Sequence, residues 1–147
     1  MKKKYTYQGT QNDHLFQAEY DHPSRTASCK SCDASQEVVR DLRDDTEPRI
    51  HYGNIASGNQ VIKNGVTREQ LRNALGVLCV EMEAAGLMSD FPCLVIRGIC
   101  DYSDSHKNKA WQEYAAATAA AFAKELLHFV SAKQTLQEKT ITEVSGK

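Results

Sequence analysis

The stretch VEMEAAGLMSDFPCLVIRGICD, residues 80–101, decides the fold because it joins two apolar elements that each carry a carboxylate. Residues 93–100 form an apolar run that predicts a buried parallel strand, and Asp101 follows it directly. Glu83 opens a short helix rich in small residues. Ligands of open α/β sheets bind outside the carboxyl ends of the strands, so both acids are expected at one pocket. The alternative is structural: Glu83 caps its own helix and Asp101 starts a turn.

The surrounding residues predict an α/β fold in which parallel strands alternate with helices. We expect strands at 51–57, 77–80 and 92–100, and helices at 67–75, from Glu83 onward and at 110–132. Thr67 and Gln70 have the spacing of a capping box at the start of their helix. The last helix is expected to turn its alanines to the packed side, with larger core residues at Phe122, Leu126, Leu127 and Phe129.

Composition divides the chain into three parts. Residues 1–48 are polar and lack sustained periodicity, which indicates an irregular, insertion-like segment. Residues 49–132 carry the α/β pattern, and the polar tail 133–147 is expected to be disordered. The net charge of −1 gives no electrostatic reason to expect nucleic acid or an acidic membrane as a partner.

The chain also shows no sign of a secreted or membrane protein. No apolar run reaches about 18 residues, and the N-terminal lysines precede no apolar stretch. The five cysteines are an odd number, and Cys79, Cys93 and Cys100 lie in apolar segments, so we interpret them as reduced core thiols. A cytoplasmic location is therefore expected.

Three motifs resemble those of the nucleoside phosphorylase and nucleosidase superfamily, whose enzymes cleave the N-glycosidic bond of purine nucleosides and related thioethers. IASGNQVI at 55–62 resembles the family's purine-lining strand and turn, and VEMEAAG at 80–86 resembles its ribose-binding motif. RGICD at 97–101 resembles the strand that ends in the family's catalytic aspartate. The motifs occur in family order over roughly residues 49–130, and the flanking regions resemble fungal multidomain proteins that carry this domain.

The resemblance implies catalytic roles for the two acids. Cleavage of the glycosidic bond builds positive charge on the sugar and negative charge on the base. Asp101 would donate or share a proton with the purine N7, as a positioned general acid. Glu83 would accept hydrogen bonds from the 2′ and 3′ hydroxyls of the ribose, and its charge would favour the cationic sugar. The resemblance implies no cofactor.

Other positions of the motifs are assigned to the same site by the resemblance. Met82 would pack beneath the ribose, and Val61 and Ile62 would line the purine, although ordinary core or strand packing also accounts for these three residue types. Arg97 lies inside an apolar run, so it is expected to bind an acid or a backbone carbonyl near the site. Cys100 stands where a serine is common in the family, and its thiol is a weaker donor to Asp101.

The resemblance is incomplete before Arg49. Family enzymes begin with a strand and a glycine-rich turn that helps to bind phosphate in phosphorylases, and their first half supplies the acid that activates water in hydrolases. Neither pattern occurs here. We therefore expect the C-terminal part of a three-layer α/β sheet with an exposed strand edge, in a chain that associates with itself or belongs to a larger multidomain protein.

Two functions stay open. One is purine nucleoside cleavage, by phosphorolysis with phosphate or by hydrolysis, with the missing half supplied by another chain. The other is a non-catalytic module that binds nucleoside or mediates association. The presence of both Glu83 and Asp101 favours the first function, and the missing first half favours the second.

A separate cluster of candidate metal ligands lies in the N-terminal segment. Cys29 and Cys32 form a CxxC pair, and His22 and His14 precede it. Zinc takes four such ligands, so a small site here would hold an otherwise loose segment. Only one CxxC pair occurs and the spacing is irregular for known zinc fingers, so a redox dithiol and ordinary reduced thiols are the alternatives.

Overall fold

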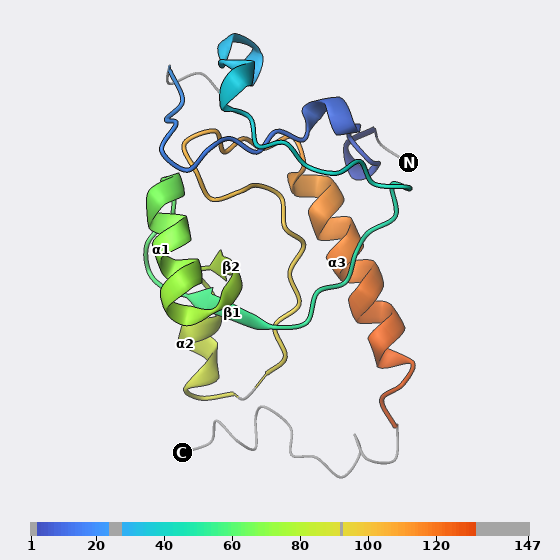
Figure 1. Cartoon of the computed structure of the whole chain (residues 1–147). Helices are drawn as coiled ribbons and strands as arrows, with labels where there is room; N and C mark the ends of the chain where they lie inside the picture. Colours follow the sequence, from blue (N-terminus) through green and yellow to red (C-terminus); the bar gives the residue numbers. More distant parts are fainter. Residues whose placement is uncertain (1–2, 24–27, 92, 132–147) are drawn as a thin grey trace.

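The structure, a computed structural model, describes residues 3–23, 28–91 and 93–131 and is a mixed α/β arrangement around a small parallel sheet (Figure 1). Its helices and strands follow the order β1 (Asn54–Ser57), α1 (Gly65–Leu75), β2 (Val77–Glu81), α2 (Ala84–Met88) and α3 (Gln112–Leu127). Short 3-10 helices precede them in the N-terminal segment: η1 (Lys3–Tyr5), η2 (Thr10–Asn12), η3 (Cys29–Ser31) and η4 (Ala34–Gln36).

The sheet confirms the prediction of parallel strands joined through a helix. β1 pairs with β2 in parallel, with Ile55 opposite Cys79 and Ser57 opposite Glu81. The register shifts after Asn54, which is opposite Val77, so β2 carries one extra residue at this point. The carboxyl ends of both strands therefore lie together at one edge of the sheet.

Helix α1 is stabilised at both ends by local hydrogen bonds. Asn64 is its N-cap, and the Asn64 Oδ1 accepts from the Thr67 backbone N at 2.9 Å. The helix thus begins before Thr67, and the capping box predicted there is wrong, because the asparagine already occupies the cap. Gly76 ends the helix in the left-handed conformation, with φ of 60°, and its N donates to the Arg72 carbonyl.

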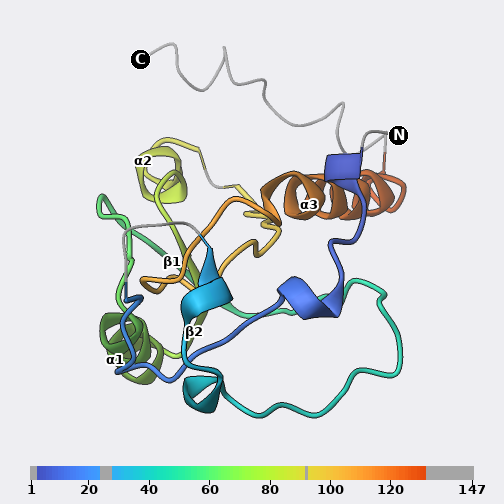
Figure 2. The ribbon, with the colours of Figure 1, turned by 90° about the horizontal axis from the view of Figure 1, so that it is seen from above.

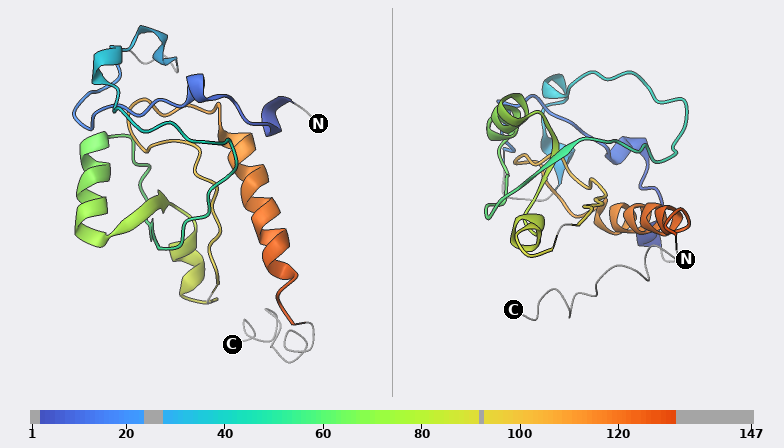
Figure 3. Two further views of the ribbon diagram at one scale, coloured as in Figure 1. Left: turned by 45° about the vertical axis from the view of Figure 1, so that its right-hand side comes forward. Right: turned by 90° about the horizontal axis from the view of Figure 1, so that it is seen from below.

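Residues 93–100 do not form the predicted strand. They run as an irregular segment between the sheet and α3 (Figures 1 and 3), and within the described residues they pair with no strand. Leu94 is 72% exposed and Ile99 is 55% exposed, and Cys93, expected to be a core thiol, is also exposed. A strand needs a hydrogen-bonded neighbour, and an apolar run alone does not supply one. Pro92, where the strand was predicted to begin, lies outside the described residues.

Helix α3 confirms the predicted C-terminal helix, but it stands apart from the group formed by α1, β1, β2 and α2 (Figures 2 and 3). The segment 93–101 runs between them and touches α3 at Gly98, where a Cβ would lie 2.0 Å from the Ala115 carbonyl oxygen. Only glycine permits this approach. None of the described helices combines the length and the apolar character needed to cross a membrane.

The core is small. Its buried apolar side chains are Phe16, Val77, Ala84 and Ala115. Leu127 and Phe129 were predicted as core residues but are 67% and 84% exposed, because the end of α3 projects beyond the sheet (Figure 1). The predicted tail 133–147 lies outside the described residues.

The N-terminal segment is irregular, as predicted, but it is anchored to the rest of the chain. An isolated antiparallel bridge joins Phe16 and Glu37. The Trp111 indole, at the start of α3, donates to the Asn12 carbonyl at 2.9 Å, and the Tyr7 ring lies edge-on to Trp111 at 5.2 Å. In Figure 2 the segment spans the molecule from α1 to α3. The domain boundary at residue 48 stays a prediction.

Candidate functional site

A pocket of about 300 Å³ opens where the carboxyl end of β2, the start of α2, the loop before α1 and the segment after residue 96 meet. Its lining includes every residue that the sequence assigned to the nucleoside site: Asp101, Glu83, Met82, Val61, Ile62 and Arg97. Three motifs that are separate in the sequence thus contribute to one concave surface. The pocket is also lined by residues that sequence reasoning did not select, among them Glu81 and Lys107.

The turn between β2 and α2 depends on Glu81 rather than on Glu83. The Glu81 Oε2 accepts from the backbone N of Glu83 at 2.8 Å and of Ala84 at 2.9 Å. Glu83 makes no capping hydrogen bond with its side chain, so the structural alternative proposed for Glu83 is wrong. Its Oε2 instead accepts from Arg97 Nη1 at 2.9 Å and from the Met82 N at 3.2 Å. The Arg97 pairing with an acid was expected.

Glu81 is a buried carboxylate at the edge of the pocket. Its residue exposure is 6%, and its Oε1 makes no hydrogen bond to the described part of the chain. Burial by itself would raise the pKa of Glu81, but the neighbouring Ser57 hydroxyl and the amides of Ala84 and Glu83 lower this pKa below its ordinary value of 4.5. An acid at the end of a strand was the signal that selected Asp101, and the same signal identifies Glu81.

Asp101 both starts a turn and faces the pocket. Its Oδ1 accepts from the Ser103 N at 3.0 Å, and Ser103 has φ of 54°, so the structural alternative for Asp101 is confirmed. Its Oδ2 lies 3.3 Å from Lys107 Nζ and accepts a hydrogen bond from Cys100 Sγ at 3.4 Å. Burial, aided by the Asp101 charge, raises the pKa of the Cys100 thiol, which therefore keeps the proton that it donates. The turn uses one carboxylate oxygen and leaves the other at the pocket.

The apolar wall of the pocket comes from side chains outside regular strands. Val61 and Ile62 lie in the loop between β1 and α1, so strand packing does not account for them. Val61 is 50% exposed and Met82 is 42% exposed, although both line the pocket. Half-exposed apolar side chains around a polar floor are suited to the flat face of a ring or a sugar.

The N-terminal segment supports the loop that follows Asp101. The Tyr102 hydroxyl donates to Asp13 Oδ1 at 2.7 Å and accepts from Arg40 Nη1 at 2.6 Å. Burial, followed by the hydrogen bond with Asp13, raises the pKa of Tyr102 to about 12. From the other side, Arg68 Nη1 donates to the Tyr102 carbonyl at 2.9 Å. Contacts distant in the sequence thus position the loop, and no local pattern predicts them.

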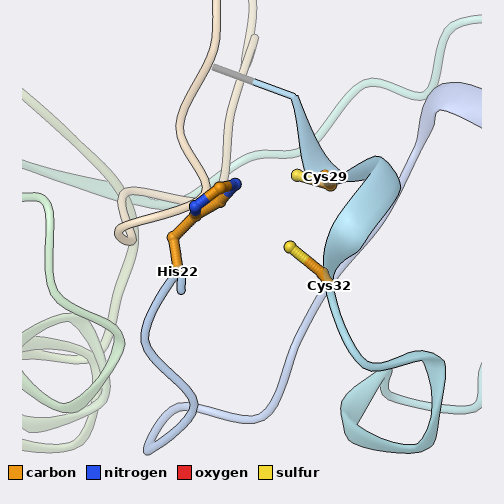
Figure 4. Close-up of side chains that lie close together, drawn as sticks. All are labelled: His22, Cys29 and Cys32. Carbon is orange, nitrogen blue, oxygen red and sulfur yellow. The ribbon is translucent and has the colours of Figure 1, made fainter. Parts of the chain in front are cut away.

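The candidate metal ligands separate into two groups. The ligand atoms of His22, Cys29 and Cys32 all lie within 4.8 Å of one another (Figure 4). His14 is not part of this group, and its Nδ1 lies 3.1 Å from Glu37 Oε1. Burial and the adjacent Cys32 thiol raise the pKa of the Cys29 thiol to about 11. This is opposite to the low pKa of a reactive redox dithiol.

The family profile described as "Phosphorylase superfamily" matches residues 4–132. The chain is 60% identical over 94 residues to a nucleotide-binding leucine-rich repeat (NLR)-like protein of the fungus Hyaloscypha variabilis, which corresponds to 64% of this chain and 10% of that protein. No solved structure gives a significant match.

Two bacterial relatives carry names that refer to nucleosidases. The chain is 33% identical over 89 residues to a 5′-methylthioadenosine/S-adenosylhomocysteine nucleosidase of Mycobacterium tuberculosis, covering 57% of this chain and 35% of that protein. It is 35% identical over 84 residues to the ATP nucleosidase Cap17 of Escherichia coli, covering 53% of this chain and 17% of that protein. The chain therefore matches between 10% and 35% of the length of these relatives.

Proposed function

Because the chain belongs to the phosphorylase superfamily, we propose that its pocket binds a purine nucleoside and that the pocket residues serve cleavage of the N-glycosidic bond. The observation that carries the proposal is the convergence of Val61, Glu83 and Asp101, from three separate motifs, on one pocket of about 300 Å³. Two similar proteins are named for nucleosidase activity on adenine compounds, so an adenine nucleoside is the proposed substrate class.

At the sugar, Glu83 is the proposed ligand of the 2′ and 3′ hydroxyls. Its side chain is 67% exposed, which leaves it accessible to a ligand. The contacts with Arg97 and Met82 go to Oε2, so a diol can approach Oε1. A carboxylate accepts two hydrogen bonds from a vicinal diol. Its negative charge stabilises the positive charge that develops on the sugar as the glycosidic bond breaks.

At the base, Asp101 is the proposed acid and Lys107 its partner. Asp101 Oδ2 and the Lys107 ammonium are 3.3 Å apart, so a purine N7 placed at this end of the pocket would meet both groups. Asp101, which accepts hydrogen bonds at both oxygens in this structure, would first take up a proton from solvent and then pass it to N7 or share it, which is typically a contribution of about 10² to 10⁴ in rate. Lys107 would stabilise the negative charge that develops on the leaving purine. Cys100 would hold Asp101 in place.

The attacking group is water in a nucleosidase and phosphate in a phosphorylase. The chain matches at most 35% of the length of the relatives described above. We propose that the residues that hold the attacking group come from a complementing part of the protein or from another chain. Binding of nucleoside would then be a property of this chain, and cleavage a property of the completed site.

A second candidate function is nucleoside binding without cleavage. The NLR-like relative supports it, because this chain matches only 10% of that protein, as one module of a much longer chain would. Under this proposal the pocket senses or holds the nucleoside, and the chain associates with other parts of a multidomain protein. The two functions share the role of Glu83 and differ in the role of Asp101.

One experiment distinguishes the two functions. Adenosine and methylthioadenosine are titrated into the chain by calorimetry, and release of adenine is followed by chromatography, for the chain alone and for a natural full-length protein that contains it. Cleavage is supported if Glu83→Gln weakens nucleoside binding and Asp101→Asn abolishes the release of adenine. Binding without adenine release in either form supports the second function. Absence of binding in both forms contradicts both.

A further inference from the structure

We propose that His22, Cys29 and Cys32 bind a zinc ion, that His106 is the fourth ligand, and that this site fastens the N-terminal segment to the loop after Asp101. The proposal is independent of the chemistry of the nucleoside pocket. The ligand atoms of the first three residues lie within 4.8 Å of one another (Figure 4). Tetrahedral zinc with bonds of about 2.0 to 2.3 Å needs neighbouring ligand atoms about 3.3 to 3.8 Å apart. A small inward movement of the side chains would achieve this.

The backbone brings the two thiols together. Cys29 and Cys32 begin and follow the 3-10 helix η3, and the Cys32 N donates to the Cys29 carbonyl at 3.0 Å. Side chains three residues apart in a 3-10 helix point in the same direction, so the two sulfur atoms face the same side. The Ser28 hydroxyl accepts from the Lys30 N and caps this turn. The thiol pair is therefore formed by local structure before any metal binds.

The imidazole of His22 completes the group of three. Its ring points toward the cysteine pair in Figure 4, and its Nε2 lies 3.2 Å from the Ser28 carbonyl, directly before Cys29. The backbone beside it is held in place, because the His22 N donates to Ser105 Oγ at 3.0 Å. An imidazole nitrogen and two thiolates are ligands that zinc prefers.

His106 is the proposed fourth ligand because it is buried with both ring nitrogens unsatisfied. It is 5% exposed, and within the described residues neither nitrogen has a hydrogen-bond partner. Its Nδ1 is 3.8 Å from Asp104 Oδ1, which is too long for a hydrogen bond. Its ring stacks on Phe16 at 4.1 Å and lies 5.1 Å from the His22 ring, beside the group of three rather than within it, so the ring would have to move toward the thiols to bind the same ion. Native structures rarely leave such a group unpaired, and a metal would supply the missing partner.

The site would connect two parts of the chain that are distant in sequence. His22, Cys29 and Cys32 lie in the segment between the bridged residues Phe16 and Glu37, whereas His106 lies in the loop after Asp101. Two thiolates balance the charge of the divalent ion, so a neutral cluster would replace two protonated thiols. Because the ligands come from both sides, loss of the metal should loosen the loop that carries Lys107.

The test measures metal in the whole chain, purified under reducing conditions without chelator. Elemental analysis should find about one zinc per chain, and replacement by cobalt should give the sulfur-to-cobalt charge-transfer absorption and the intense visible bands of a tetrahedral thiolate site. Cys29→Ser, Cys32→Ser and His22→Ala should each abolish stoichiometric zinc. Cys93→Ser and His14→Ala are matched controls, because Cys93 is an exposed thiol and His14 lies outside the cluster, and both should retain it.

A second measurement covers variants that fail to fold. Wild-type chain is stripped with a chelator, its thermal unfolding is recorded, and zinc is titrated back; the melting temperature should fall on removal and recover on addition. His106→Ala should weaken zinc binding at least about tenfold, by comparison with the effect of altering even indirect partners of a metal. The proposal is overturned by a wild-type chain without zinc or a cobalt thiolate spectrum, by a Cys29–Cys32 disulfide in place of metal, or by equal zinc loss in Cys93→Ser. Unchanged affinity in His106→Ala removes that residue from the site.

Discussion

The candidate nucleoside pocket and the hollow beside α3 are neighbours, but they are built in opposite ways. The pocket encloses about 300 Å³, and its carboxylates are held by backbone amides, an arginine, a lysine and a thiol. The hollow encloses about 1150 Å³ between the segment 93–101, α3 and the edge of the sheet, and its lining is mainly apolar, with charged residues such as Arg43 and Glu125 among it. These include Ile50, Tyr52, Leu78 and Leu94, each more than half exposed.

The difference shows which interactions this chain completes by itself. The contacts of Glu81 and Cys100 are to residues nearby in sequence, so they form as soon as the local backbone does. The apolar surface of the hollow is not covered by any element in the described part of the chain, so another molecule would have to cover it. Exposed apolar surface of this kind marks an interaction site.

The largest effect is expected from Asp101→Asn in an active form of the protein. Turnover of an adenine nucleoside should fall by about 10² to 10⁴-fold, because the asparagine cannot deliver a proton to the base. Binding should change less, since the proton matters chiefly as charge develops on the purine. Steady-state kinetics measures both quantities. Asp90→Asn, at an exposed aspartate outside the pocket, is the control, and an equal loss in that variant would contradict the assignment.

Glu83→Gln should weaken both binding and turnover by about 10- to 100-fold, the range expected for loss of a charged hydrogen-bond acceptor. The discriminating comparison uses a 2′-deoxy nucleoside, which lacks one of the hydroxyls assigned to Glu83. Replacing the ribonucleoside by the 2′-deoxy nucleoside should reduce binding and turnover by a larger factor in the wild type than in Glu83→Gln. If the change of substrate reduced binding and turnover by the same factor in the wild type and in Glu83→Gln, Glu83 would not be the ligand of the diol.

Glu81→Gln should destabilise the fold at neutral pH by about 1 to 3 kcal/mol, because a buried acceptor of two backbone amides loses its charge. The folded-state pKa of Glu81 is below its ordinary value, so its contribution is complete above about pH 5 and is lost as the pH falls through the folded-state pKa. Unfolding in urea at several pH values should show this loss in the wild type. The variant should lack it, and the exposed Glu19→Gln should behave like the wild type.

The hollow should cause self-association. Sedimentation velocity of the isolated chain should show dimers or larger species, and Leu94→Glu should weaken association about tenfold or more, because it places a charge on the apolar surface. Leu127→Glu is the matched control, since Leu127 is similarly exposed but lies outside the hollow. A clean monomer with a sharp, cooperative melt at low concentration would show that the chain closes the hollow by itself.

The smallest effect is expected from Cys100→Ser. A hydroxyl is a stronger donor than a thiol, so the hydrogen bond to Asp101 Oδ2 should shorten, and turnover should rise by no more than a few-fold. The same variant should leave nucleoside binding unchanged. A large loss of turnover in kinetic assays would show that the thiol has a role other than supporting Asp101.

Local patterns predicted most of the secondary structure and the composition of the pocket. The sequence indicated β1, α1, β2, α2 and α3, because residue pattern and periodicity act within a few residues of each other, although the cap of α1 is Asn64 and not Thr67. It also selected six of the residues that line the pocket, because their motifs resemble those of a known family. The sequence by itself therefore determined which side chains are available to bind and cleave a substrate.

Only the tertiary structure decided how those groups are held. An apolar run at 93–100 predicts a strand, but a strand requires a neighbour, and the described chain offers none. The pairing of Arg97 with Glu83, and the approach of His106 to His22, depend on segments that lie apart in the sequence. Hydrogen bonds and ion pairs between such segments have no sequence period, so the fold alone determines them.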